Sequence, residues 1–127
     1  MDKAKIIEVC RSLSISQCKY CVGFGAALVL YGIKVSTNDV DIEVIPEVFE
    51  AFSGNYPIKY CSDGEAYISI DDVVDMFKCS NLPSKPVIIN GIPVFPLQNI
   101  LEKKKRLGRT KDIKDIEMIE SFLQGKL

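Results

Sequence analysis

Two aspartates separated by one residue are the groups in this chain most suited to chemistry. Asp39 and Asp41 alternate with Val40 and Ile42 in a pattern that is typical of a strand. Side chains two residues apart on a strand share a face, so the two carboxylates point the same way, and Glu43 can join them. Clustered carboxylates repel each other, and burial raises their pKa. The pair therefore indicates a site at which a positive charge offsets this repulsion.

A divalent metal ion with oxygen ligands would offset it. Mg²⁺ is commonly held by one or two carboxylates together with substrate phosphates. Upstream, Gly25 leads into 26–31, which predicts a short apolar helix ended by Gly32. Free N–H groups at a helix N-terminus favour a phosphate. A phosphate cradle followed by a carboxylate pair supplies the parts that phosphoryl or nucleotidyl transfer needs. The alternative is an edge strand with one solvated face, preceded by a plain glycine turn.

The residue content excludes several kinds of catalytic site. The chain has no histidine, so Ser-His-Asp and Cys-His sites and histidine-bound metals are impossible. The net charge is −1, so no global positive field points to nucleic acid or membrane. No stretch approaches the roughly 18–20 apolar residues that span a bilayer, and the first residues lack a signal-peptide pattern. We therefore expect a cytoplasmic protein with no membrane partner.

The five cysteines form an odd and irregularly spaced set. Cys18 and Cys21 have the CxxC spacing of zinc ligands or of a redox pair. A structural zinc site takes four ligands, however, and the chain has no second close pair and no histidine. We expect reduced thiols and interpret these residues as ordinary core or loop cysteines.

The remaining pattern predicts the elements that position these residues. Asp2 is placed to cap a helix whose apolar face includes Ile6 and Cys10. Residues 71–77 fit a strand or a helix. The other predicted elements are strands at 20–22, 39–44, 58–61, 66–70, 87–89 and 92–95, and helices at 46–52, 97–107 and 113–123. Since the chain has no repeat or linker, we expect a single α+β domain spanning residues 1–127.

Two blocks of sequence resemble one known superfamily. The stretch from Val22 to Val44 resembles the core motif of the nucleotidyltransferases, in particular the small prokaryotic branch of minimal nucleotidyltransferases and abortive-infection toxins. That motif reads G-G-x-A-L-x-L-H-G-x-x-R-x-T-x-D-I-D. A second block, from Leu101 to Ile116, is similar to the family's L-x-x-K-x-x-x-G-R-x-K-D-x-x-D-I. The residues that match the first motif are Gly25, Ala27, Leu28, Leu30, Gly32, Thr37, Asp39 and Asp41.

The resemblance implies a fold and a reaction. The fold is a short mixed β-sheet packed against helices, with C-terminal helices closing the site. The reaction transfers a nucleoside monophosphate from an NTP to a hydroxyl of RNA, of a protein side chain or of a small molecule, with Mg²⁺ or Mn²⁺ as cofactor. The setting it suggests is a prokaryotic or phage protein, of the toxin–antitoxin kind.

The resemblance also implies a set of site residues. Asp39 and Asp41 would be metal ligands and catalytic. A third carboxylate usually comes from a later strand flanked by apolar residues, which fits Asp75 if 71–77 is a strand, with Asp72 as the second choice. The residues expected to contact the nucleotide are Gly25, Ala26, Thr37, Lys104 and Lys111.

This chain departs from the motif at several positions. Phe24 replaces the first glycine of the pair, Tyr31 the usual histidine, and Val35 the arginine that would bind phosphate as a planar fork. These changes keep open an alternative from another class, a catalytically degenerate member that acts as a binding or inhibitor module. A basic run between Lys103 and Lys114 is interpreted either as a rim that holds an RNA backbone or as a solvated helix face.

Overall fold

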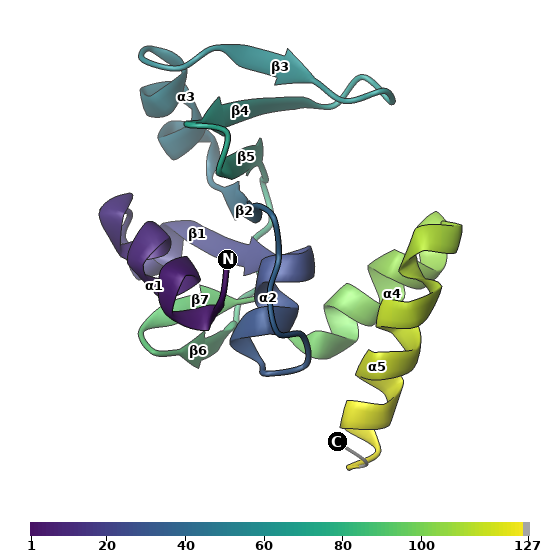
Figure 1. The fold of residues 1–127 in the computed structure, drawn as a ribbon. Coiled ribbons are helices and arrows are strands. Elements are labelled where there is room, and N and C mark those ends of the chain that lie inside the picture. Colours follow the sequence, from purple (N-terminus) through teal and green to yellow (C-terminus); the bar gives the residue numbers. More distant parts are fainter. Residues whose placement is uncertain (126–127) are drawn as a thin grey trace.

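The aspartate pair lies at the start of the central strand of a seven-stranded mixed sheet. In the computed structural model, which describes residues 1–125, the strand order is β3-β4-β5-β2-β1-β7-β6 (Figure 1). Strand β2 runs antiparallel to β1 and parallel to β5. The strands are β1 (Tyr20–Gly23), β2 (Val40–Val44), β3 (Ile58–Tyr60), β4 (Ala66–Ile70), β5 (Val74–Lys78), β6 (Val87–Ile89) and β7 (Ile92–Val94). This arrangement confirms the expected α+β class.

The alternation along β2 separates an apolar face from a polar one. Val40, Ile42 and Val44 are completely buried, whereas Asp41 and Glu43 between them are partly exposed. Burying an aliphatic side chain of this size contributes about 1.5–3 kcal/mol relative to leaving it exposed. A slip of one residue would bring the carboxylates into the core, so the apolar residues fix the register that presents Asp41 on the opposite face.

Three helices cover the apolar face of the sheet. They are α1 (Lys3–Ser12), which Asp2 caps by accepting a hydrogen bond from the Lys5 N–H, α2 (Phe24–Leu30) and α3 (Pro46–Ser53). Helix α2 packs on β1 and β2, while α3 packs on β4 and β5. Ile6, Leu28 and Phe49 join the strand residues in one core. The polar face with the carboxylates is left free of these helices.

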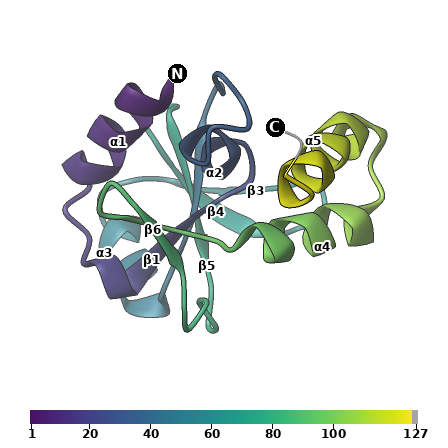
Figure 2. The ribbon, with the colours of Figure 1, turned by 90° about the horizontal axis from the view of Figure 1, so that it is seen from below.

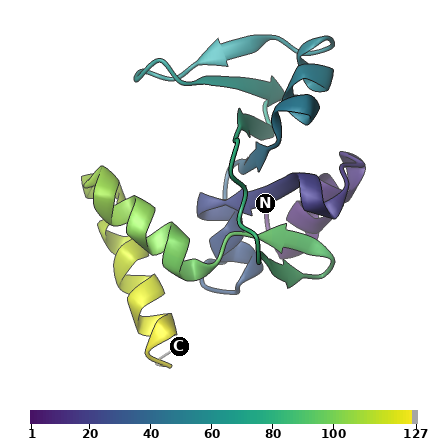
Figure 3. The same ribbon diagram turned by 180° about the vertical axis from the view of Figure 1, so that it is seen from behind.

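The C-terminal helices form a hairpin of their own. Helix α4 (Leu97–Leu107) ends at Gly108, whose φ of +61° suits glycine, and α5 (Ile113–Leu123) runs back beside it. Figures 2 and 3 show that the two helices of this hairpin lie side by side and are set apart from α1 and α3. Two short 3₁₀ turns, η1 (Gln17–Lys19) and η2 (Thr110–Asp112), complete the elements. No helix within residues 1–125 has the length and apolar character needed to cross a membrane.

The segment that fitted either a strand or a helix is a strand after a tight turn. Asp71 and Asp72 both have positive φ, 53° and 56°, as the central residues of a type I′ turn do. The chain therefore reverses after Ile70, and β5 pairs with both β4 and β2. The turn that joins β6 and β7 is similar: Asn90 and Gly91 have φ values of 52° and 80°, as the sequence predicted.

Candidate active site

Three aspartates from two neighbouring strands form a cluster of carboxylates. Asp41 on β2 and Asp75 on β5 are register partners in the parallel pair, and Asp39 lies one residue before β2. One oxygen from each of the three carboxylates lies within 4.8 Å of the other two. Within residues 1–125 this is the one group of three or more histidine, cysteine or acidic side chains gathered so closely. Asp72, the second choice for the third carboxylate, is exposed and pairs with Lys59 instead.

The carboxylates of the cluster repel one another, and the pKa values of Asp41 and Asp75 are raised. The pKa of Asp41 is raised from 3.8 to about 7, chiefly by burial and then by the charges of Asp39 and Asp75, against the opposing charges of Lys103 and Lys104. Burial, followed by the charge of Asp39, also raises the pKa of Asp75. None of the three carboxylates forms an ion pair in the part of the chain described, so the nearby lysines offset their repulsion only in part.

Gly25 and Thr37 lie against each other beside the cluster. A Cβ added at Gly25 would lie 2.8 Å from the Thr37 hydroxyl oxygen, and that hydroxyl donates a hydrogen bond to the carbonyl oxygen of Asp39 at 3.3 Å. Gly25 does not have a positive φ; the left-handed residue is Phe24, at +49°. Ala26 is in the first turn of α2, and its side chain is buried in the core. The glycine is thus explained by the close approach of Thr37.

The two predicted lysines lie in different surroundings. Lys104 is buried, with its Nζ 2.9 Å from Asp112 Oδ1 and 3.4 Å from Asp115 Oδ2. Burial pushes the pKa of Asp112 up, but hydrogen bonds from Arg109 and Lys104 outweigh burial and lower it overall. Lys104 therefore joins α4 to α5. Lys111 is exposed in the η2 turn beyond the end of α4, and within residues 1–125 it forms no ion pair.

A cavity next to the carboxylates contains residues that the sequence did not single out. Its volume is about 240 Å³. Asn99, Lys103 and Arg106 enter it from one face of α4, at the i, i+4 and i+7 spacing of a helix. Lys103 and Arg106 belong to the basic run, but only the position of α4 shows that they face a cavity together with Asn99. The other lining residues are Gly23, Phe24, Glu43, Cys79, Asn81, Phe95 and Ile100.

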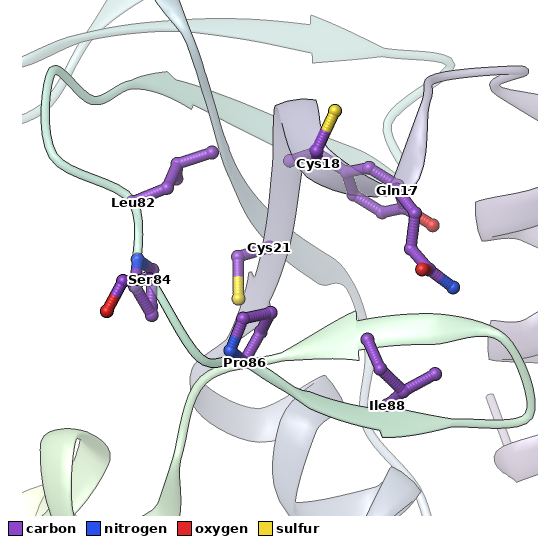
Figure 4. A pocket seen from close by; sticks show the side chains of 9 residues that line it. Gln17, Cys18, Cys21, Leu82, Ser84, Pro86 and Ile88 are labelled. Carbon is purple, nitrogen blue, oxygen red and sulfur yellow. The ribbon is translucent and has the colours of Figure 1, made fainter.

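A larger cavity of about 480 Å³ lies beside Cys18 and Cys21, the two cysteines with CxxC spacing. It is bounded by η1, β1 and the segment before β6 (Figure 4). The sulfurs of Cys18 and Cys21 point in different directions in this view. Burial, with smaller contributions from Glu43 and Cys79, raises the pKa of Cys21 to about 12. A thiol with so high a pKa is a poor nucleophile and a poor metal ligand. Both cysteines are free, which supports the interpretation of ordinary cysteines.

Comparison with known proteins identifies the fold. No protein-family model matches the chain, and no curated protein matches it. The chain is similar to the crystal structure of a candidate nucleotidyltransferase from Thermotoga maritima, with a TM-score of 0.61 and 18% sequence identity over 98% of this chain and 96% of that chain. This likeness does not extend to the toxin-like branch that the motif resembled. It confirms that the chain has a nucleotidyltransferase-like fold.

Proposed function

We propose that this protein transfers a nucleoside monophosphate from an NTP to an acceptor hydroxyl in a metal-dependent reaction. The observation that carries the proposal is the cluster of Asp39, Asp41 and Asp75, whose carboxylate oxygens lie within 4.8 Å of one another. A partly buried set of like charges is unfavourable without a counter-charge. The nucleotidyltransferase-like fold supports the choice of reaction.

The residues of the cluster fit a hard divalent cation. They offer only carboxylate oxygens, which Mg²⁺ and Mn²⁺ prefer, and no basic side chain of the described residues is bonded to them. Asp39 and Asp41 would be the ligands. When bound, such an ion neutralises charge on the phosphates during the displacement.

The proposed chemistry at the chain's own residues is a single displacement. The acceptor hydroxyl oxygen forms a bond to the α-phosphorus, the bond from that phosphorus to the bridging oxygen breaks, and pyrophosphate leaves. The Asp75 carboxylate accepts the hydroxyl proton, a role that its raised pKa suits. It lies beside Asp41 in the register, which places proton acceptor and metal ligand on the same face of the sheet.

The phosphates are proposed to lie between the start of α2 and helix α4. Backbone N–H groups at Gly25 and Ala26 and the Thr37 hydroxyl would contact them from one side. Lys104 would contribute from the other, because an ammonium has three N–H donors and the two carboxylates that it meets engage two of them. Lys111, which lies in the exposed η2 turn, would contact the γ-phosphate of the NTP from there.

One observation favours a second candidate, a binding or inhibitor module without catalysis. Phe24 lines the cavity beside the carboxylates, at a position where the resembled motif has glycine. A bulky ring there restricts the space for phosphates. A module without catalysis would have no need of the carboxylate cluster, so an activity assay separates the two candidates.

The assay incubates each NTP, labelled at the α-phosphate, with Mg²⁺ or Mn²⁺ and three acceptor pools: total RNA, protein extract and metabolites. Transfer predicts label on one of these pools with wild-type protein and loss of label with Asp41→Asn. Glu117→Gln, an exposed charge change on α5, is the matched control and should label normally. Absence of label with every NTP and both ions would contradict transfer and favour the binding module.

A further inference from the structure

Phe24 holds a backbone conformation that a bulky side chain rarely adopts. Its φ is +49°, in the left-handed region. The other residues besides glycine with positive φ in residues 1–125 are small and polar and lie in turns or in a loop: Ser14, Asp71, Asp72 and Asn90. Glycine would hold the Phe24 conformation without strain. Strain of this kind persists where the surrounding structure enforces it, and it clusters at functional sites.

The ring of Phe24 is held at the wall of the cavity beside α4. The Nζ atoms of Lys103 and Lys104 lie 4.7 Å and 5.4 Å from its centroid, which is within cation–π range. The ring of Phe95 lines the same cavity, next to Gly23, where an added Cβ would lie 3.5 Å from it. Two aromatic side chains, Phe24 and Phe95, thus line one cavity together with polar side chains from α4 and β2.

The carboxylate cluster does not line this cavity, but two of the lining residues, Gly23 and Glu43, are neighbours of Asp41 in the sheet. Gly23 is the register partner of Asp41 across β1 and β2, and directly opposed residues of antiparallel strands have Cα atoms about 4.5–5.5 Å apart. Glu43 shares the face of Asp41 two residues further along β2. A nucleotide with its phosphates at the carboxylates would therefore have the cavity within reach of its remaining parts.

We propose that this cavity is the nucleobase subsite of the donor nucleotide, with Phe24 as the wall against which the base stacks. The assignment rests on the proposed function. A volume of about 240 Å³ is smaller than the roughly 300–1,000 Å³ of pockets that enclose whole drug-sized ligands. It suits one planar ring system rather than a complete nucleotide.

The polar side chains of the cavity match the edge of a base. Asn81 and Asn99 each present an N–H donor and a C=O acceptor, the groups with which amides read base edges. The Glu43 carboxylate disfavours a phosphate at this place, whereas it accepts hydrogen bonds from an exocyclic amine. Lys103 and Arg106 bring positive charge, so a phosphate subsite is the competing assignment that the experiment must separate.

The test compares ligands with and without a base. Calorimetry in Mg²⁺ measures the affinity of each NTP and of inorganic tripolyphosphate for wild-type protein, Phe24→Gly and Phe24→Tyr. Glycine removes the ring and fits the backbone, while tyrosine keeps the ring. We expect Phe24→Gly to weaken the preferred NTP roughly tenfold or more and to leave tripolyphosphate within twofold, with Phe24→Tyr close to wild type. Phe52→Leu, which removes a ring stacked on Tyr56, is the matched control.

Two results would overturn the assignment. If Phe24→Gly tightens or weakens tripolyphosphate as much as the NTP, the cavity is a phosphate subsite; if neither ligand changes, the ring has no part in binding. A separate titration with the four free nucleosides, followed by the side-chain amide NMR signals of Asn81 and Asn99, does not depend on phosphate binding. Shifts there would support a base subsite even if no NTP were bound or transferred. Absence of NMR shifts, together with an unchanged NTP affinity in Phe24→Gly, would refute the assignment of a base subsite.

Discussion

At the scale of single residues, the carboxylates could be predicted from the sequence and their partners could not. The alternation of Asp39 and Asp41 with apolar residues is a local signal, because a period of two places both on one face. Asp75 was predicted only on the condition that 71–77 is a strand, since its place beside Asp41 depends on pairing between strands that are distant in sequence. For Phe24 the sequence holds no such signal, because its positive φ is not encoded in its residue type.

Replacing Asp41 by Asn is predicted to stabilise the metal-free protein above neutral pH. The pKa of Asp41, raised to about 7 in the folded state, lies above the 3.8 of an ordinary aspartate. The group therefore favours folding fully below about pH 4, and this contribution is lost as the pH rises through 7. Urea unfolding in EDTA should show the free energy of unfolding of Asp41→Asn exceeding that of wild type increasingly from pH 5 to pH 7, by on the order of 1–3 kcal/mol, and levelling off above it. A difference that does not vary with pH would contradict the raised pKa.

At the scale of elements, hairpins with local turn signals were predicted correctly. The Asn90–Gly91 pair specifies a turn by its own conformational preference, so β6 and β7 could be placed from sequence alone. The segment 71–77 could not be resolved, because Val73, Val74 and Phe77 also suit a helix face. Pairing with β2 decides it, since tertiary packing overrides weak local preference. The ion pairs that join α4 to α5 were likewise invisible in the basic run.

Replacing Lys104 by Met is predicted to destabilise the α4–α5 hairpin strongly. It leaves the buried Asp112 with Arg109 as its remaining cationic partner within residues 1–125, and because removing one partner of a buried pair costs about 3–5 kcal/mol, we expect a loss at or somewhat below this range. Urea unfolding should show this loss, and Lys104→Met with Asp112→Leu should recover most of it. Lys105→Met, which breaks an exposed pair with Glu120, should change the free energy of unfolding by less than about 1 kcal/mol. Equal effects of the two lysine changes would refute the structural role of Lys104.

At the scale of the whole molecule, the fold brings together two blocks that are separate in sequence. The strand with Asp41 and the helix with Lys103 approach each other closely enough for the lysine to lower the pKa of the aspartate. The sequence order of the blocks suggested the fold, which is now confirmed. The sequence did not show that Lys104, Lys105 and Arg109 form ion pairs within the protein. Because of these pairs, fewer positive charges are free to bind RNA than the basic run suggests.

If RNA is bound, its affinity is predicted to depend only moderately on salt. Four cations of the run form no ion pair in the part of the chain described: Lys103, Arg106, Lys111 and Lys114. For single strands each neutralised phosphate adds about 0.7 to the slope of log affinity against log salt concentration, so we expect a slope of about −3 or shallower. Fluorescence anisotropy with a labelled oligonucleotide measures it. A slope near −5 would mean that all seven cations contact phosphate and that the ion pairs break on binding.

The measurement that tests the central claim most directly is calorimetric titration of each NTP into the protein with Mg²⁺ and with EDTA. If Asp39 and Asp41 hold a cation that binds the nucleotide, wild-type protein binds at least one NTP in Mg²⁺ and loses that binding in EDTA. Asp39→Asn and Asp41→Asn should remain folded and lose the Mg²⁺-dependent binding, while Glu117→Gln keeps it. NTP binding of unchanged affinity in both aspartate variants would contradict the account.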